Sequence, residues 1–203
     1  MGRSLSEELL RRGHRVRGLV RKGSEKRIAA GSECVTGDAL AGESYRDRVA
    51  GAGTYVHLVG VSHPDPSKAE QFRSIDLASA KEAVSAARAA GVPHFVYVSV
   101  AHPAPIMREY VAARTEAEDA IRAAGLNATI LRPWYVLGPG RRWPLLLLPV
   151  YWAMGALPQT RASARRLGLV TLRQMVDTLA GAVEKPATGV RIVEVPEIRL
   201  TRF

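Results

Sequence analysis

The sequence predicts a protein of the α/β class, in which helices cover both faces of a parallel sheet. Apolar runs of strand length alternate along the chain with segments whose apolar residues recur at helical spacing. Glycines follow several of the helical segments, as they do at helix C-termini. Strands that alternate with helices in this way are joined by right-handed crossovers, which make them parallel. Such sheets bind ligands at the carboxyl ends of their strands.

The first half of the chain contains three of the predicted strands. Leu5, Leu9 and Leu10 share one face of a helix that ends at Gly13. The apolar runs after it predict strands at residues 14–20, 33–36 and 54–59, with a short helix around residues 43–49.

The second half continues the alternation and ends in a segment of different composition. Apolar spacing predicts helices at residues 80–87 and 110–124, and strands at residues 94–99 and 128–131. Beyond them we expect a helix at residues 172–183, opened by a capping box of Thr171 and Gln174, and a last strand at residues 190–195. We interpret residues 1–203 as a single domain, with a nucleotide-binding core (1–140) and a small C-terminal cap on the substrate side (141–203).

Composition and charge exclude several classes of protein. The formal net charge is +10, but its arginines are scattered and no nucleic-acid-binding motif accompanies them, so we expect no nucleic-acid partner. No apolar run of 18 residues and no secretion signal occurs, which predicts a cytoplasmic protein. Cys34 is the only cysteine and has no metal-ligand pattern around it, so we expect no metal site.

Several short motifs occur in a fixed order between residues 2 and 140. They are Gly2-Arg3-Ser4-Leu5, Gly13-His14-x-Val16, Gly37-Asp38, His57-Leu58-Val59-Gly60, Ala90-Gly91-Val92-Pro93, Tyr110-x-x-x-Arg114, Leu131-Arg132-Pro133 and Gly138-Pro139-Gly140. Together they resemble the short-chain dehydrogenase/reductase superfamily, in its extended and atypical branches with NAD(P)H-binding, NAD-dependent epimerase/dehydratase-like and NmrA-like proteins. The resemblance implies a Rossmann-type doubly wound parallel sheet that binds a dinucleotide, a fold that hosts many reactions.

The resemblance starts inside the family's glycine-rich turn. In that family a first strand leads into a GxxGxxG turn, whose glycines let the backbone approach the pyrophosphate at a helix N-terminus. Gly2 stands where the last of these glycines is expected, and the next helix and strand follow without a gap. We therefore expect an N-terminally truncated sheet that lacks its first strand. The strands ending at Val20 and Val59 should then leave a slot roughly 9 to 10 Å wide between them.

The resemblance also implies which residues bind the cofactor. Arg21 and Lys22 follow the second strand of the family order, where cations favour the 2′-phosphate of NADP(H) over NAD(H). The alternative is that both are solvated side chains of a basic surface. The remaining cofactor-binding residues implied by the resemblance are Gly2, Asp38, Val59, Gly60, Arg132 and Pro133.

A catalytic triad is implied only in altered form. The family transfers a proton through a Tyr that is assisted by a Lys four residues later, with a Ser or Thr at the end of the neighbouring strand. Tyr110 is followed at that spacing by Arg114, which lies on the same helix face but is not equivalent to Lys. Ser99 is the candidate hydroxyl, and the next residue is Val100. Tyr110 also lies on the apolar stripe of its helix, so a packed core tyrosine is the alternative.

Two functions from different classes remain open at this point. The first is an NADP(H)-dependent oxidoreductase or epimerase-like enzyme for a small or apolar carbonyl compound. The second is a non-catalytic dinucleotide-binding redox sensor or assembly factor, which agrees with Arg114 and Val100. The run from Trp143 to Pro158 contains no charged residue and has three interpretations. It packs onto the sheet as core, it lines a pocket for an apolar substrate, or it contacts a membrane interface.

The expected missing strand gives a direct prediction. In-frame codons upstream of Met1 should encode one strand and a glycine turn, about 10 to 15 residues. We expect a protein extended by these residues to be more thermally stable and to bind NADPH more tightly than the 203-residue chain. Equal stability and equal affinity of the two forms would contradict this interpretation.

Overall fold

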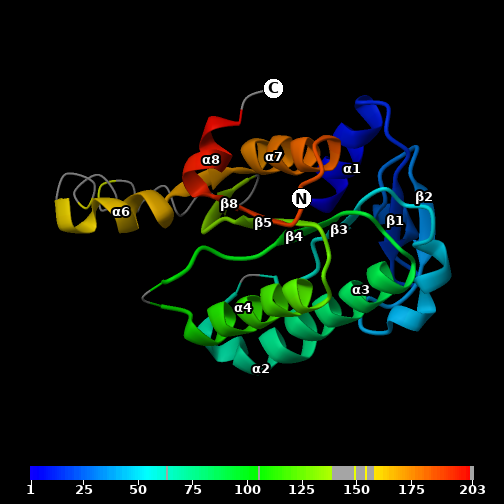
Figure 1. Cartoon of the computed structure of the whole chain (residues 1–203), viewed down its shortest axis with the longest axis horizontal. Helices are drawn as coiled ribbons and strands as arrows, with labels where there is room; N and C mark the ends of the chain where they lie inside the picture. Colours follow the sequence, from blue (N-terminus) through cyan, green and yellow to red (C-terminus); the bar gives the residue numbers. More distant parts are fainter. Residues whose placement is uncertain (63, 105, 139–148, 150–153, 155–157, 202–203) are drawn as a thin grey trace.

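The fold has three layers, with a sheet between two groups of helices (Figure 1). The computed structural model describes residues 1–62, 64–104, 106–138, 149, 154 and 158–201. Helices α1 (Gly2–Arg11) and α7 (Leu172–Glu184) cover one face of the sheet, and α3 (Ala78–Ala89) and α4 (Arg108–Ala123) cover the other. The predicted α/β class is confirmed.

The main sheet has four parallel strands in the order β3-β4-β5-β8. These are β3 (Tyr55–His57), β4 (Phe95–Val98), β5 (Ala128–Arg132) and β8 (Val190–Glu194). Each pair is in parallel register, so the carboxyl ends of all four strands lie at one edge of the sheet. This edge is where ligands bind in parallel sheets.

Two further strands form a separate sheet. β1 (Arg17–Val20) pairs in parallel with β2 (Glu33–Thr36), and no hydrogen bond joins β1 to β3 in the part of the chain that the structure describes. A cavity of about 1420 Å³ is lined by residues of both β1 and β3, and the slot width expected there stays a prediction. Its volume exceeds the roughly 300 to 1,000 Å³ of most small-molecule sites.

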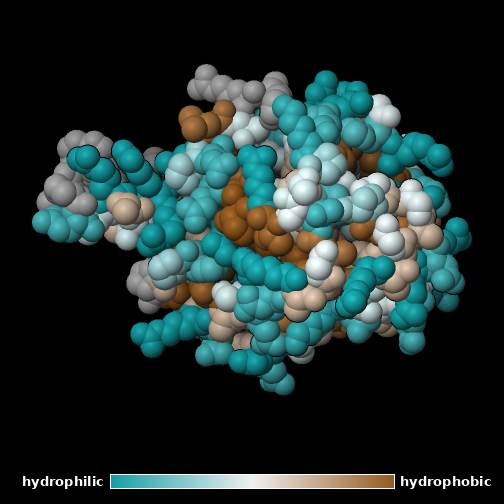
Figure 2. Space-filling model, viewed as in Figure 1, coloured by the Kyte–Doolittle hydropathy of each residue, from teal (hydrophilic) through white to brown (hydrophobic). Residues whose placement is uncertain are grey.

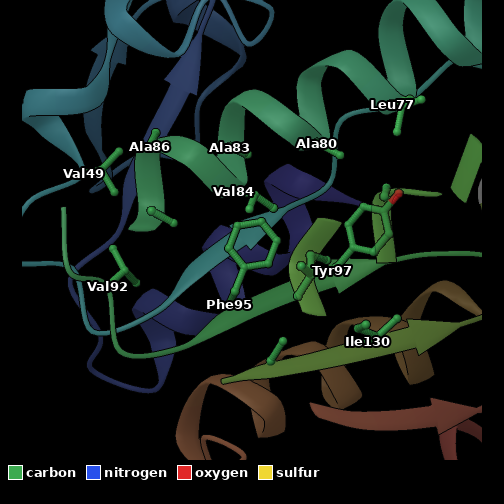
Figure 3. Packing of buried hydrophobic residues seen from close by; sticks show 14 of the residues in the cluster. Val49, Leu77, Ala80, Ala83, Val84, Ala86, Val92, Phe95, Tyr97 and Ile130 are labelled. Atoms are coloured by element: carbon green, nitrogen blue, oxygen red, sulfur yellow. The ribbon is translucent and has the colours of Figure 1, made fainter. Parts of the chain in front are cut away.

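The strands of the main sheet are buried on both faces. On β4, Phe95 and Tyr97 face the cluster formed with α3 and α4, and Val96 faces the cluster formed with α1 and α7. Figure 3 shows the rings of Phe95 and Tyr97 directed toward α3, whose Ala80 and Ala83 are fully buried. Alanines on this helix face let α3 lie close to the sheet, which explains why an alanine-rich segment forms core.

One predicted helix is replaced by two shorter turns. In place of the helix expected at residues 43–49, the structure has the 3₁₀ helices η2 (Gly42–Ser44) and η3 (Arg46–Arg48), separated by Tyr45. Tyr45 has φ −139° and ψ −1°, outside the α-helical region, and is only 3% exposed, because its ring packs into the cluster that includes α3. Burial of this ring therefore prevents the segment from forming one continuous helix.

The C-terminal part confirms two predicted elements and adds others. The Thr171–Gln174 capping box opens α7, and β8 is the expected last strand. The additional elements are β6 (Tyr135–Leu137), which pairs in parallel with β7 (Leu169–Thr171), and the helices α6 (Pro158–Arg166) and α8 (Val195–Leu200). Most of the run from Trp143 to Pro158 lies outside the described residues.

Shorter helical segments complete the chain. They are η1 (Glu25–Arg27), η4 (Pro66–Lys68), α2 (Ala69–Gln71) and the π-helix η5 (Phe72–Leu77), which runs into α3. None of the described helices is long and apolar enough to span a bilayer. Figure 2 shows an apolar band across the middle of the molecule, between the two helical layers.

Candidate active site

Most residues implied to bind the cofactor lie around the cavity between β1 and β3. Gly2 begins α1, Arg21 follows β1, and Asp38 follows β2. These three residues line the cavity together with Val59 and Gly60, which follow β3. Lys22 is exposed beside Arg21 but does not line the cavity. The ends of three strands and the start of one helix therefore meet at this cavity.

Helix α4 directs three polar residues, four positions apart, toward the end of β4. Tyr110 is partly buried and its ring packs 5.0 Å from that of Phe72. Arg114 is 6% exposed, and Glu118 is fully buried. Residues four apart share a helix face, so this row of side chains follows from the sequence spacing.

Arg114 connects α4 to β4 and to the π-helix. Its Nη1 donates to the carbonyl oxygen of Val98 at 2.9 Å and to the hydroxyl of Tyr97 at 3.3 Å. Its Nη2 lies 3.3 Å from Oδ2 of Asp76, which is fully buried. The guanidinium carbon is 5.2 Å from the ring centre of Tyr110, within the range of a cation–π contact.

Burial and charge act against each other in this group. Burial lowers the pKa of Arg114, but Tyr110, Tyr97 and Asp76 together raise it above the usual value. Burial raises the pKa of Asp76, and Arg114 and the amide of Val61 only partly oppose that rise. Arg114 therefore remains a cation at any physiological pH.

Glu118 joins four polar side chains at the carboxyl ends of β4 and β5. Its carboxylate accepts hydrogen bonds from Ser99 Oγ at 2.6 Å and from Arg122 at 2.9 Å. Arg132 donates through Nε and Nη2 to its two oxygens, and His102 Nε2 lies 3.4 Å away. Burial raises the pKa of Glu118, but the hydrogen bonds from Arg132 and Ser99 outweigh it and the pKa is lowered.

Comparison with known proteins identifies the family. Residues 1–141 match the model of the family described as NAD(P)H-binding. The chain belongs to this family. It is also 31% identical, over 202 residues, to the ceramide reductase of Caulobacter vibrioides (strain NA1000 / CB15N). That alignment covers 98% of this chain and 62% of the relative, so the chain spans about three fifths of the length of the curated relative.

Solved structures show the same fold at low sequence identity. UDP-glucose 4-epimerase of Thermus thermophilus, in complex with NAD, superposes with a TM-score of 0.66 at 17% identity, over 98% of this chain and 78% of that chain. A short-chain dehydrogenase/reductase superfamily protein of Agrobacterium tumefaciens with bound NAD gives a TM-score of 0.68 at 19% identity, over 95% and 74% of the chains. The NAD(P)H-binding chain thus has the Rossmann-like fold of this superfamily.

The cavity of this NAD(P)H-binding protein fits a dinucleotide. Gly2 places the N-terminus of the ten-residue helix α1 at the cavity, where free N–H groups and the helix dipole favour a phosphate. Gly37 and Gly60 let backbone line the wall without a side chain. Arg21 is exposed at the end of β1 and has a charge that suits a phosphate, and Asp38 is exposed at the end of β2.

The candidate catalytic residues are brought together only in part. Tyr110 and Arg114 lie side by side, as the spacing predicts. Ser99 is 3% exposed and donates its hydroxyl hydrogen to Glu118, so that hydrogen is already committed. Arg132 and Pro133, which the resemblance implies bind the cofactor, do not line the cavity: Arg132 is bound to Glu118, and the carbonyl oxygen of Pro133 accepts from the amide of Ala101 at 2.9 Å.

Sequence reasoning missed the two buried carboxylates of this region. Glu118 continues the four-residue spacing of Tyr110 and Arg114, and this signal could have identified it. Asp76 lies on the π-helix 38 residues before Arg114, and no local pattern connects the two.

Glu118 gives the first test of this arrangement. We expect Glu118→Gln to lower the free energy of unfolding by about 3 kcal/mol at pH 7, because it leaves Arg132 without its buried counter-ion. The folded-state pKa of Glu118 is lowered, so its contribution is present above the unfolded value of about 4.3 and is lost as the pH falls through the folded value. The difference in urea-unfolding free energy should therefore shrink below about pH 4.

A matched control lies on the same helix. Glu116 is exposed and forms an ion pair with Lys81 at 2.7 Å. Glu116→Gln should change the free energy of unfolding by less than about 1 kcal/mol. If Glu118→Gln and Glu116→Gln lowered the free energy of unfolding by similar amounts, the structural role of Glu118 would be contradicted.

Proposed function

We propose that this NAD(P)H-binding protein is a reductase of an apolar carbonyl compound that prefers NADP(H). One observation carries this proposal. Gly60 lines the dinucleotide-sized cavity, and a methyl group in its place would overlap Nη2 of Arg114. The cation beside Tyr110 therefore lies directly behind Gly60, one residue from the space where a substrate carbonyl and a dinucleotide would meet.

The chain's own residues would supply the proton for such a reduction. A bound reduced dinucleotide supplies a hydride to the carbonyl carbon. Tyr110 would donate the phenolic proton to the carbonyl oxygen, which gives an alcohol, and would regain a proton from water. Arg114 would stabilise the negative charge that develops on the phenol oxygen. Ser99 could donate a hydrogen bond to the substrate carbonyl only if it gave up its hydrogen bond to Glu118.

The substrate class rests on composition and on the curated relative. The run from Trp143 to Leu157 contains no charged residue and belongs to the part of the chain expected to form the substrate-side cap. The relative from Caulobacter vibrioides is named a ceramide reductase. Both support a carbonyl compound with a long apolar portion rather than a sugar nucleotide.

A non-catalytic dinucleotide-binding protein is the second candidate. It is favoured by the buried ion pair of Arg114 with Asp76 and by the hydrogen bond of Ser99 to Glu118. In that case both polar clusters serve stability, and the protein acts as a redox sensor or assembly factor.

Turnover separates the two candidates. We expect NADPH oxidation with a ketone bearing a long acyl chain, and a loss of at least about 100-fold in kcat for Tyr110→Phe, because the proton donor is removed. The dissociation constant for NADPH should change less than about twofold. If NADPH binds but no carbonyl compound is reduced and Tyr110→Phe changes nothing, the non-catalytic function is the correct one.

Arg21 provides the test of cofactor preference. We expect the protein to bind NADPH more tightly than NADH, and Arg21→Asp to weaken NADPH binding by about 1 to 3 kcal/mol, because a charge-assisted contact to the 2′-phosphate is lost. Arg88→Asp, an equal change of charge on the exposed side of α3, is the control. An unchanged ratio of the two affinities in Arg21→Asp would rule out this role. The affinities for NADPH and for NADH are measured by titration, followed by the fluorescence of the reduced nucleotide.

A further inference from the structure

The guanidinium of Arg114 occupies space that only a glycine at position 60 leaves open. An ideal Cβ at Gly60 would overlap Nη2 of Arg114 and would lie 3.1 Å from Oδ1 of Asp76. The loop after β3, the π-helix and α4 thus converge on one point behind Gly60, which itself lines the cavity. Position 60 is therefore restricted by Arg114 itself, in addition to any ligand in the cavity.

Each carboxylate oxygen of Asp76 faces a different N–H group, one of the backbone and one of Arg114. Its Oδ1 accepts from the amide of Val61 at 2.6 Å, and its Oδ2 faces Nη2 of Arg114 at 3.3 Å. An asparagine would turn an NH₂ group toward one of these donors. Within the described part of the chain, Oδ2 of Asp76 and Nε of Arg114 are buried without a hydrogen-bond partner, so the attraction between the two side chains is ionic.

The π-helix explains why an acidic residue points into this core. Phe72, Asp76 and Leu77 are all buried within η5. A π-helical segment changes the spacing of side chains relative to an α-helix, and such segments are frequent at functional sites. Asp76 is thereby directed toward Val61 and Arg114.

The other groups around Arg114 do not compensate its charge. His57 on β3 is fully desolvated, which together with Arg114 lowers its pKa to about 3, so it is neutral. Burial raises the pKa of Tyr97 on β4 to about 12, so it is also neutral. Glu118 on α4 is engaged by Arg132 and Arg122. Among the described residues, Asp76 is the carboxylate within ion-pairing distance of Arg114.

We propose that Asp76 and Gly60 together hold the guanidinium of Arg114 beside Tyr110 and directly behind the cavity-lining Gly60, and that Asp76 is thereby a positioning residue for proton transfer by Tyr110. This rests on the proposed reductase function. The site uses an arginine where the family resemblance implies a lysine, and an arginine needs two things that a lysine does not. It needs space for the planar guanidinium, which Gly60 leaves, and a counter-ion that fixes its orientation, which Asp76 supplies.

Two double-mutant cycles, read by urea unfolding of the full chain, test how Arg114 is held. Asp76→Asn should raise the unfolding equilibrium constant at least about tenfold, but much less in an Arg114→Met background, where no guanidinium remains to be paired. Gly60→Ala should destabilise the protein when Arg114 is present and should be tolerated with Arg114→Lys, which removes the overlapping atom. Asp119→Asn, in the exposed ion pair with Arg122 on the same helix, is the control and should change the constant less than about fivefold.

A kinetic cycle tests the positioning role. We expect Asp76→Asn to lower kcat at least about tenfold while the KM for NADPH changes less than about threefold. In a Tyr110→Phe background Asp76→Asn should lower the residual rate no further, because Asp76 acts through Tyr110. A merely structural effect would lower the rate equally in both backgrounds and would overturn the positioning role.

The outcomes distinguish this proposal from the proposed function. If the effect of Asp76→Asn on unfolding is the same with and without Arg114, the assignment of Asp76 and Gly60 is wrong whatever the protein catalyses. If both unfolding cycles show the expected coupling but no carbonyl compound is reduced, Arg114 is held as proposed, and the positioning role falls together with the reductase function.

Discussion

The buried charges of α4 are the interactions on which the rest of this structure depends. Arg114 and Glu118 lie one turn apart and carry opposite charges into the protein interior, where an unpaired charge is strongly destabilising. Arg114 is compensated by Asp76 and by the carbonyl oxygen of Val98, and Glu118 by Arg132 and its other donors. Asp76, Val98 and Arg132 belong to the π-helix, β4 and β5, so these contacts fix α4 against all three elements. The edge of the sheet where ligands bind is fixed by the same contacts.

This arrangement sets a limit on what the catalytic residues can do. A hydroxyl hydrogen that is donated to a buried carboxylate is not available to a substrate, and Ser99 donates to Glu118. A guanidinium fixed by Val98 and Asp76 cannot swing as a lysine ammonium can. For the proposed reductase, this leaves Tyr110 as the proton donor. The proposed reduction would therefore depend on Tyr110 more heavily than in a triad in which three residues share the work.

The sequence predicted the parts of the fold that have a clear period. The runs at β4 and β5 are continuous and apolar, which is typical of strands buried on both faces, and the stripes of α4 and α7 have helical spacing. It failed at residues 42–48, where burial of Tyr45 breaks the helix, and it missed β6 and β7, which are three residues each. Tyr110 and Arg114 could be paired from their spacing, whereas Asp76 reaches Arg114 only through the tertiary fold.

The opening between β1 and β3 links the stability of the sheet to cofactor binding. Parallel strands are stable when backbone groups on both edges are paired, and neither β1 nor β3 has a described partner on the edge that faces the other. The cavity between them exceeds the volume of most small-molecule sites, which suits a ligand as large as a dinucleotide. Gly2 lies at this cavity, at the start of α1. A ligand bound in this cavity would contact both strands and the start of α1, so we expect dinucleotide binding to raise the stability of the sheet.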